Sequence, residues 1–219
     1  MDFKGLISFL SKLGSNNNKD WFNQNRKEYE ALRANWIGFV DELIQSIQAF
    51  DPAIGMLDPK KCIFRINKDI RFSKNKSPYK TNFGVIITHG GKKEIFSGYY
   101  LHIDPKEIFI AGGSYQPPAD MLSSIRQEID YNFEEFNKIV SNKKCCSLFG
   151  ELKGNKLSRP PKGYDLENPA INYLKHKGFI WVQNFKVKEL YDPNFQKTIV
   201  ESFKEMKPLN NFINRTIGN

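Results

Sequence analysis

Positive charge in the sequence is concentrated between residues 60 and 80. Eight lysines and arginines fall there against a single carboxylate, Asp69, so this segment carries +7 of the chain's formal net charge of +9. A local field of one sign attracts anions and is unfavourable when nothing neutralises it. The segment therefore indicates a site for an anionic ligand. A lysine-rich loop exposed to solvent has the same composition and is the alternative interpretation.

Apolar and polar residues alternate almost strictly from residue 62 to residue 73, inside the basic segment. One side of an extended chain would carry Cys62, Phe64, Ile66, Ile70 and Phe72. The other side would carry Arg65, Asn67, Asp69, Arg71 and Ser73. This alternation predicts a strand with one buried face, broken near Asn67 and Lys68 because strands usually run for about five or six residues.

Two guanidinium groups and a carboxylate would stand together on the polar side of this strand. Arginine binds carboxylate and phosphate through two parallel hydrogen bonds, and Asp69 is a candidate acid, base or orienting group. We therefore predict an anion-binding site that comprises Arg65, Lys68, Arg71, Ser73, Lys74, Tyr79 and Lys80. The alternative is an ion-pair cluster that only fixes the strand to a helix.

A second candidate group lies in the segment from residue 98 to residue 104, which is expected to be a strand. Tyr100, His102 and Asp104 would share one face, and Tyr99, Leu101 and Ile103 the other. Histidine transfers protons near neutral pH, so His102 is the second candidate catalytic residue and Tyr100 a supporting one. A single histidine in a strand is more often structural.

Two loops supply the remaining candidates. Residues 111–118 form a glycine-containing connection between an expected strand and a helix, where backbone amides can approach an anion. Gly112, Gly113 and Tyr115 are supporting residues on this interpretation, although an ordinary strand-to-helix turn is favoured. In the proline-rich loop from residue 157 to residue 164, Lys162 and Tyr164 would close over a ligand or simply cap the surface.

Several of these motifs together resemble a family of conserved hypothetical bacterial proteins, domain of unknown function 2461. The main one runs from Phe64 to Lys74 and continues through Pro78–Asn82 and Gly84. The others are Asn18–Phe22 with Asn25, Arg26 and Tyr29, then Gly98–Ile103, Gly112-Gly113 with Tyr115 and Pro117, and Pro161–Asp165. The resemblance covers nearly the whole chain. It implies a compact α+β fold and no particular activity.

Other classes of site are excluded by the residue types and their spacing. Cys62, Cys145 and Cys146 form no C-x-x-C pair, and the three histidines are scattered, so neither a metal site nor a disulfide framework is expected. No cofactor motif or nucleophile elbow is present. The first residues lack the features of a secretion signal, and no apolar stretch is long enough to span a membrane. We expect a cytoplasmic protein.

Hydrophobic periodicity predicts a single α+β domain over residues 1–219. A short helix is expected over residues 3–13 and a long one over 22–50. Segments 83–89, 94–103 and 107–111 are expected strands, and because short turns join them, they must form an antiparallel meander. Helices are expected from 117 to 140 and from 192 to 206, with a strand at 179–185 between them. The meander would pack against the long N-terminal helix and the C-terminal helices.

Three functions fit this sequence. The leading hypothesis is an enzyme or binding protein for a small phosphorylated or carboxylated ligand. The main alternative is a non-specific nucleic-acid-binding protein, in which Phe72, Tyr79 and Phe83 stack on bases between basic residues. The third is a structural or protein-interaction domain that meets an acidic partner. Nothing in the sequence indicates an oligomeric state.

Overall fold

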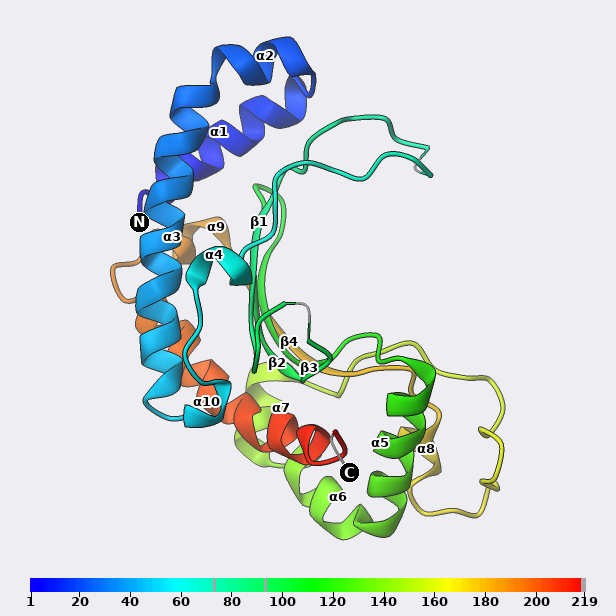
Figure 1. Cartoon of the computed structure of the whole chain (residues 1–219). Helices are drawn as coiled ribbons and strands as arrows, with labels where there is room; N and C mark the ends of the chain where they lie inside the picture. The colour runs from blue at the N-terminus through cyan, green and yellow to red at the C-terminus, as the bar shows by residue number, and fades with distance from the viewer. Residues whose placement is uncertain (73, 93, 218–219) are drawn as a thin grey trace. The chain divides into compact units, whose positions relative to one another are not determined.

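Four strands form one antiparallel sheet in a computed structural model that describes residues 1–72, 74–92 and 94–217 (Figure 1). They are β1 (Phe83–Ile87), β2 (Gly98–Ile103), β3 (Ile108–Ser114) and β4 (Phe179–Phe185). The order across the sheet is β1-β2-β3-β4, so strands that follow one another in sequence are neighbours in space. The expected α+β fold with an antiparallel meander is therefore confirmed.

The chain divides into two compact units. The first comprises Met1–Lys92, Tyr100–Ile110 and Asn184–Val200, and the second comprises Lys93–Tyr99, Ala111–Gln183 and Glu201–Asn219. Strands β2, β3 and β4 each contribute residues to both units. The expectation of a single domain over the whole chain stays a prediction.

Helices at the N-terminus build the first unit. They are α1 (Phe3–Ser15), α2 (Lys19–Gln24) and α3 (Arg26–Gln48), followed by the 3-10 turn η1 (Pro52–Ile54) and the short helix α4 (Pro59–Cys62). The expected continuous helix is interrupted at Asn25, whose backbone leaves the helical region and whose side-chain amide donates to the carbonyl oxygen of Trp21. Asparagine competes with helix in this way because its side chain bonds nearby backbone groups.

The buried side of the sheet packs on α3 in the first unit. The indole of Trp36 in α3 meets the ring of Phe83 in β1 edge to face, with the ring centroids 5.8 Å apart. Val85, Leu101 and Ile103 are buried on the same side of the strands. Alternate positions of the strands are therefore left on the opposite, partly exposed face, as the two-residue period requires.

The strand expected over residues 62–73 does not form in the part of that range that the structure describes, residues 62–72. Cys62 ends α4, whose first turn is capped by the Asp58 side chain, and only isolated bridges follow: Ile63 with Val85, and Asn67 with Tyr79. Beyond these bridges Phe72 is 96% exposed, so the apolar side of the segment is not buried along its length. Alternation sets the direction of side chains, and here no neighbouring surface covers the far end.

Two further boundaries differ from expectation. The connection between β1 and β2 is longer than expected: a turn closed by Gly91 and Thr88 is not followed at once by strand, and β2 begins only at Gly98. Strand β3 continues through Gly112 and Gly113 to Ser114, so these glycines lie within the sheet and not in a loop before a helix. By contrast, β2 and β3 are joined by the tight turn expected from residue 104 to residue 107.

The second unit holds most of the later helices. They are α5 (Ala119–Tyr131), α6 (Phe133–Val140), α7 (Lys143–Phe149) and α8 (Ile171–Leu174). The short α9 (Val187–Leu190) belongs to the first unit, and α10 (Phe195–Asn214) begins there and ends in the second. Helix α10 runs past the expected end at Met206 because Leu209, Phe212 and Ile213 bury its apolar side.

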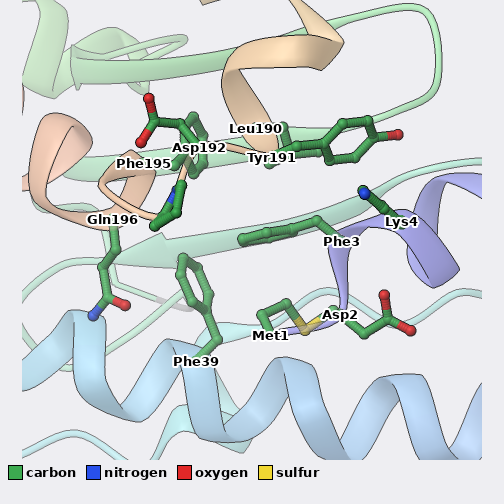
Figure 2. Close-up of a pocket in the computed structure, with 11 residues that line it drawn as sticks. Met1, Asp2, Phe3, Lys4, Phe39, Leu190, Tyr191, Asp192, Phe195 and Gln196 are labelled. Carbon is green, nitrogen blue, oxygen red and sulfur yellow. The ribbon is translucent and has the colours of Figure 1, made fainter.

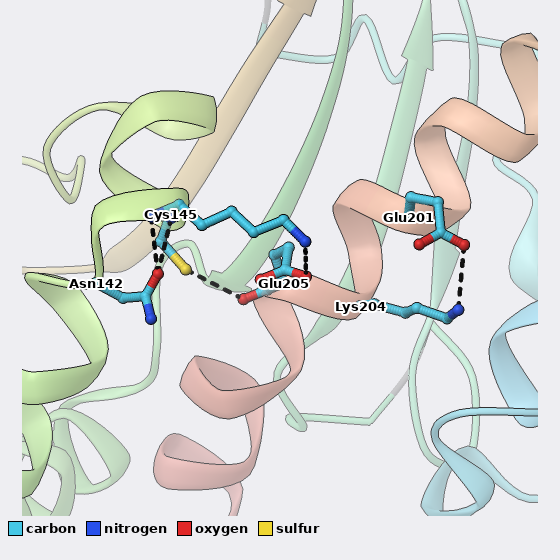
Figure 3. Close-up of polar contacts among 6 residues, drawn as sticks. Asn142, Cys145, Glu201, Lys204 and Glu205 are labelled. Atoms are coloured by element: carbon cyan, nitrogen blue, oxygen red, sulfur yellow. Dashed lines mark hydrogen bonds and ion pairs between the residues drawn. The ribbon is translucent and has the colours of Figure 1, made fainter.

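Polar contacts fix α7 beside α10 within the second unit (Figure 3). The Asn142 side chain accepts hydrogen bonds from the backbone amides of Lys144 and Cys145, which makes it the N-cap of α7. The Lys144 ammonium lies 2.7 Å from the Glu205 carboxylate, and the Cys145 thiol donates to the Glu205 carbonyl oxygen. Asn142 thus caps α7, while two contacts with Glu205 tie the helix to α10.

Candidate functional site

The partly exposed face of β2 carries the polar pair that alternation predicted. Tyr99, Leu101 and Ile103 are buried, whereas Tyr100 and His102 are half-buried on the other side, which confirms the expected alternation. The Tyr100 hydroxyl lies 2.9 Å from Nδ1 of His102. The two side chains therefore form a hydrogen-bonded pair on this face.

Aromatic rings support this pair. The His102 imidazole stacks on Phe109 of β3, with the centroids 4.8 Å apart and the planes 13° from parallel. The ring of Phe64 meets Tyr100 edge to face at 6.1 Å. Phe64 is held there because its amide donates to the carbonyl oxygen of Gly84 at 3.0 Å.

Gly84 in β1 makes room for this arrangement. A Cβ atom at this position would lie 2.9 Å from the Tyr100 hydroxyl and 3.4 Å from the Phe64 ring. Real Cβ atoms rarely approach so closely, so a side chain here would push the tyrosine away. The absence of a side chain at Gly84 allows the Tyr100 ring to lie across β1.

Two lysines lie over the same aromatic ring. The ammonium groups of Lys80 and Lys92 are 5.4 Å and 5.9 Å from the centroid of Phe64. The Lys92 ammonium also donates to the carbonyl oxygen of Ile63 at 2.6 Å. We call this set the aromatic–lysine face, and its members are Phe64, Lys80, Gly84, Lys92, Tyr100, His102 and Phe109.

The surroundings shift the pKa values of three groups on this face. Burial, followed by the nearby charges of Arg65 and Lys92, lowers the pKa of Lys80. Burial raises the pKa of Tyr100 to about 12. Burial also lowers the pKa of His102, against the opposing charges of Asp104 and Glu107. At neutral pH the face thus holds a protonated phenol and a neutral imidazole, beside a lysine whose positive charge is opposed by its surroundings.

Two carboxylates, those of Asp104 and Glu107, lie near His102 at the turn between β2 and β3. Asp104 accepts hydrogen bonds from the Thr81 hydroxyl at 2.8 Å and from the amide of Lys106, so its oxygens are occupied in stabilising the turn. In the part of the chain that the structure describes, no carboxylate forms an ion pair with Lys80, Lys92 or Arg65. Within the described residues these three cations therefore have no ion-pair partner.

The structure brings only part of the predicted anion-binding set to this face. Arg65 and Lys80 are close enough for their charges to interact. Arg71 is instead bound to Asp69 through two hydrogen bonds of 3.0 and 2.6 Å, and both side chains are largely exposed. These bonds lower the pKa of Asp69. Asp69 is thus an ionised partner of Arg71, and nothing in its surroundings suits it to take up a proton.

Residues 66–72 and 74–79 form an arm that leads away from the strands, and we refer to it as the basic arm (Figure 1). Lys68 and Lys74 lie on it, and Ser73, another predicted ligand-binding residue, falls outside the described residues. Tyr79 is buried at the base of the arm, stacked on Phe22 at 4.0 Å. The Asn17 side chain bonds both backbone polar groups of Tyr79 at 3.0 Å. Tyr79 therefore anchors the arm.

The glycines predicted to support the site have packing roles in the second unit. A Cβ atom at Gly112 would lie 2.7 Å from the sulfur of Met206 in α10. Gly113 has φ +117°, and a Cβ there would meet the carbonyl oxygen of Phe179 at 2.0 Å. Both positions require glycine because α10 and β4 approach β3 closely. This close packing accounts for both glycines without a role in ligand binding.

The other supporting residues also lie in the second unit. Tyr115 is 68% exposed and lines a pocket of about 510 Å³ with Asn155 and Lys177. Lys162 is exposed on the loop that follows α7, and Tyr164 is half-buried near Arg126 and Asp130, where burial raises its pKa. These residues belong to a different unit from the aromatic–lysine face.

A second pocket, of about 400 Å³, lies in the first unit between α1, α3 and the start of α10 (Figure 2). Phe3 meets Phe39 and Phe195 edge to face, at 5.3 and 5.8 Å, and the Lys4 ammonium lies 5.8 Å from the Tyr191 ring. No residue from 65 to 80 lines either of these two pockets. The expected basic cleft stays a prediction.

Sequence reasoning missed four members of the aromatic–lysine face, namely Phe64, Gly84, Lys92 and Phe109. Phe64 was assigned to a buried side, yet it is 40% exposed. Lys92 lies outside the basic segment and reaches Phe64 from the connection between β1 and β2. Phe109 had a usable signal, because alternation in β3 places it on the partly exposed face between the buried Ile108 and Ile110.

The class of protein defined by this fold is an α+β protein with an antiparallel meander and a basic, aromatic face on the strands. Within that class the chain belongs to the family of conserved hypothetical proteins described as DUF2461, whose sequence profile matches residues 5–212. Neither the search of curated proteins nor that of solved structures found a significant match. The resemblance stated from the motifs is therefore confirmed.

The described residues contain no group of three or more His, Cys, Asp or Glu side chains placed to hold a metal ion. None of their helices combines the length and the apolar composition that crossing a bilayer requires.

Proposed function

We propose that the protein binds a small phosphorylated or carboxylated ligand on the aromatic–lysine face. The observation that carries this proposal is the position of Lys80 and Lys92, two ammonium groups within 6 Å of one aromatic ring and without a carboxylate partner among the described residues. Two cations held together over a partly apolar surface repel each other. An anion placed between them relieves that repulsion.

The rest of the face supports binding of such an anion. Arg65 adds a third positive charge, and the partial burial of Lys80 strengthens its interactions relative to bulk water. Phe64 and Phe109 offer apolar contacts to the remainder of the ligand. The His102 ring, which is neutral at pH 7, offers a hydrogen-bond donor. We include the cytoplasmic location in the proposal, since the three cysteines are unpaired.

Calorimetric titration of the full chain tests the proposal. Inorganic pyrophosphate, citrate and adenosine monophosphate are the probes, all at one fixed ionic strength. Lys80→Ala should weaken the affinity for the tightest-binding probe by about tenfold or more. The reason is that a hydrogen bond to a charged group contributes roughly 1.5–3 kcal/mol. Lys80→Arg, which keeps the charge, should retain most of the affinity.

A matched control separates the site from general charge. Lys27→Ala removes the same charge from the exposed side of α3 and should leave the affinity unchanged. The proposal is wrong if none of the three probes binds, or if Lys80→Ala and Lys27→Ala bind the best probe equally well. Melting temperatures of all variants establish that they remain folded.

A further inference from the structure

The basic arm has a firmly held base. The Lys80 amide donates to the Ile66 carbonyl at 2.7 Å, and the Lys68 amide donates to the Pro78 carbonyl at 2.8 Å, so the two sides of the arm pair like a hairpin. Tyr79 is fixed at the base by Asn17 and Phe22. The part beyond Lys68 is therefore carried outward on an anchored support (Figure 1).

The end of the arm combines cations with one exposed ring. Residues 68–76 contain four cations and a single carboxylate, so this stretch carries a net charge of +3. Phe72 is 96% exposed, and the Arg71 guanidinium lies 6.0 Å from its ring centroid. The Lys76 ammonium closes the end by donating to the Ile70 carbonyl at 3.1 Å. The arm's end therefore presents one open aromatic ring within a short stretch of net positive charge, the combination found at stacking sites for nucleic-acid bases.

We propose that the end of the basic arm binds single-stranded nucleic acid, a function separate from the ligand site proposed above. An unpaired base stacks on the Phe72 ring, and Lys68 and Lys74 contact the phosphates on either side, while Arg71 stays paired with Asp69. Proteins that bind single strands without sequence preference combine these two elements, a basic surface and aromatic rings. Tyr79 and Phe83, the other expected stacking residues, are buried, so stacking rests on Phe72 alone.

The composition of the arm's end favours this partner over two others. A stable protein interface has an apolar centre depleted of charge, whereas here a single ring is surrounded by cations. Binding to a membrane surface depends on buried apolar area as well as charge, and Ile70 beside Phe72 is already half-buried in the arm. Stacking needs only one exposed ring.

Fluorescence anisotropy with a labelled 20-nucleotide oligothymidine tests the inference in 50–200 mM KCl. Phe72→Ala should weaken binding by about 5-fold to 100-fold, the loss expected when one base stops stacking on an aromatic ring. Replacing Lys68 and Lys74 together by alanine should reduce the slope of log K against log salt by about 1.4, since each phosphate contact to a single strand contributes about 0.7.

Each substitution in the arm has a control variant that makes the same kind of change elsewhere on the chain. Tyr131→Ala removes another exposed aromatic ring, and Lys27→Ala with Lys197→Ala removes two exposed charges; neither should alter binding by more than about twofold. Phe72→Trp keeps an aromatic ring, so it should bind normally, and its added fluorescence should be quenched by the oligonucleotide.

Three outcomes would overturn the inference. The first is no binding of the oligonucleotide at 50 mM KCl. The second is an affinity of Phe72→Ala equal to that of Tyr131→Ala. The third is sedimentation of the protein with phosphatidylserine-containing vesicles, dependent on Phe72, while binding of the oligonucleotide is independent of Phe72. That result would assign the exposed ring to a membrane surface.

Discussion

The Tyr100 hydroxyl lies 2.9 Å from Nδ1 of His102, and among the described residues this nitrogen is the only hydrogen-bond partner of the hydroxyl. Because burial raises the pKa of Tyr100 to about 12, the phenol keeps its proton at neutral pH. A phenol is a stronger donor than acceptor, so we expect its O–H to donate to Nδ1 and the hydrogen of the neutral imidazole to lie on Nε2. His102 thus presents a donor, at Nε2, on the side of the ring away from the tyrosine.

This assignment predicts the tautomer of His102 in solution. Long-range proton–nitrogen correlation spectra at pH 7.5 should show the pattern of the Nε2–H form, and Tyr100→Phe should weaken that preference because Nδ1 loses its donor. The ring should also protonate below the ordinary histidine pKa of about 6.5, since burial disfavours the charged form. The signals of His102 are identified by their absence from the spectrum of His102→Gln. A spectrum showing Nδ1–H would contradict the predicted hydrogen bond.

A second histidine couples folding to pH. His176 in the second unit is 1% exposed, its Nδ1 has no hydrogen-bond partner in the described structure, and burial together with the charge of Lys156 lowers its pKa to about 4. Between pH 6.5 and pH 4 the unfolded chain therefore binds a proton that the folded chain does not. The free energy of unfolding must fall as the pH falls through this window.

The expected loss from His176 is about 2 kcal/mol between pH 7 and pH 5. Urea denaturation at the two pH values measures it, and His176→Gln should remove that part of the difference because glutamine does not titrate. His102→Gln serves as the comparison, since His102 is only half-buried. An equal pH dependence in the wild-type chain and His176→Gln would contradict the lowered pKa of His176.

Gly113 is expected to be the most restrictive glycine in β3. Two features disfavour a side chain at this position. Its φ is +117°, and a Cβ atom would lie 2.0 Å from the carbonyl oxygen of Phe179. Gly163 has φ +91° and no atom within 4 Å of such a Cβ, so Gly163→Ala measures the backbone strain alone, about 1–2 kcal/mol. Gly113→Ala should destabilise the fold by at least about 2 kcal/mol more, because backbone atoms must move. If urea denaturation shows the same loss of unfolding free energy for Gly113→Ala and Gly163→Ala, the close contact at Gly113 is refuted.

Much of the strand arrangement follows from the sequence because short turns leave few alternatives. The turn at residues 104–107 is too short for anything but an antiparallel pair, and alternation in β2 then places Tyr100 and His102 on one face. The break at Asn25 is less predictable, since the apolar spacing continues through it. There a side-chain hydrogen bond to the Trp21 carbonyl competes with the helix.

The candidate site was only partly predictable, for a physical reason. Local alternation indicates the direction of a side chain, but not whether another surface covers it, so Phe64 and Phe72 were both assigned to a buried side. Lys92 joins the site through contacts with Phe64, which is far away in sequence. Similarly, the requirement for glycine at Gly112 and Gly113 arises from α10 and β4, which the local sequence does not show.

The three cysteines should differ sharply in reactivity. Burial raises the pKa values of Cys62 and Cys145 to about 11, so at pH 8 only about one thiol in a thousand is ionised at each position. Cys146 is exposed on α7, next to the Cys145 thiol that points toward Glu205 (Figure 3). We expect a disulfide reagent such as dithionitrobenzoate to modify one thiol rapidly in the folded chain and all three in urea. Cys146→Ser should abolish the rapid phase, whereas Cys145→Ser should leave it intact; the reverse result would mean that α7 presents its other side to solvent.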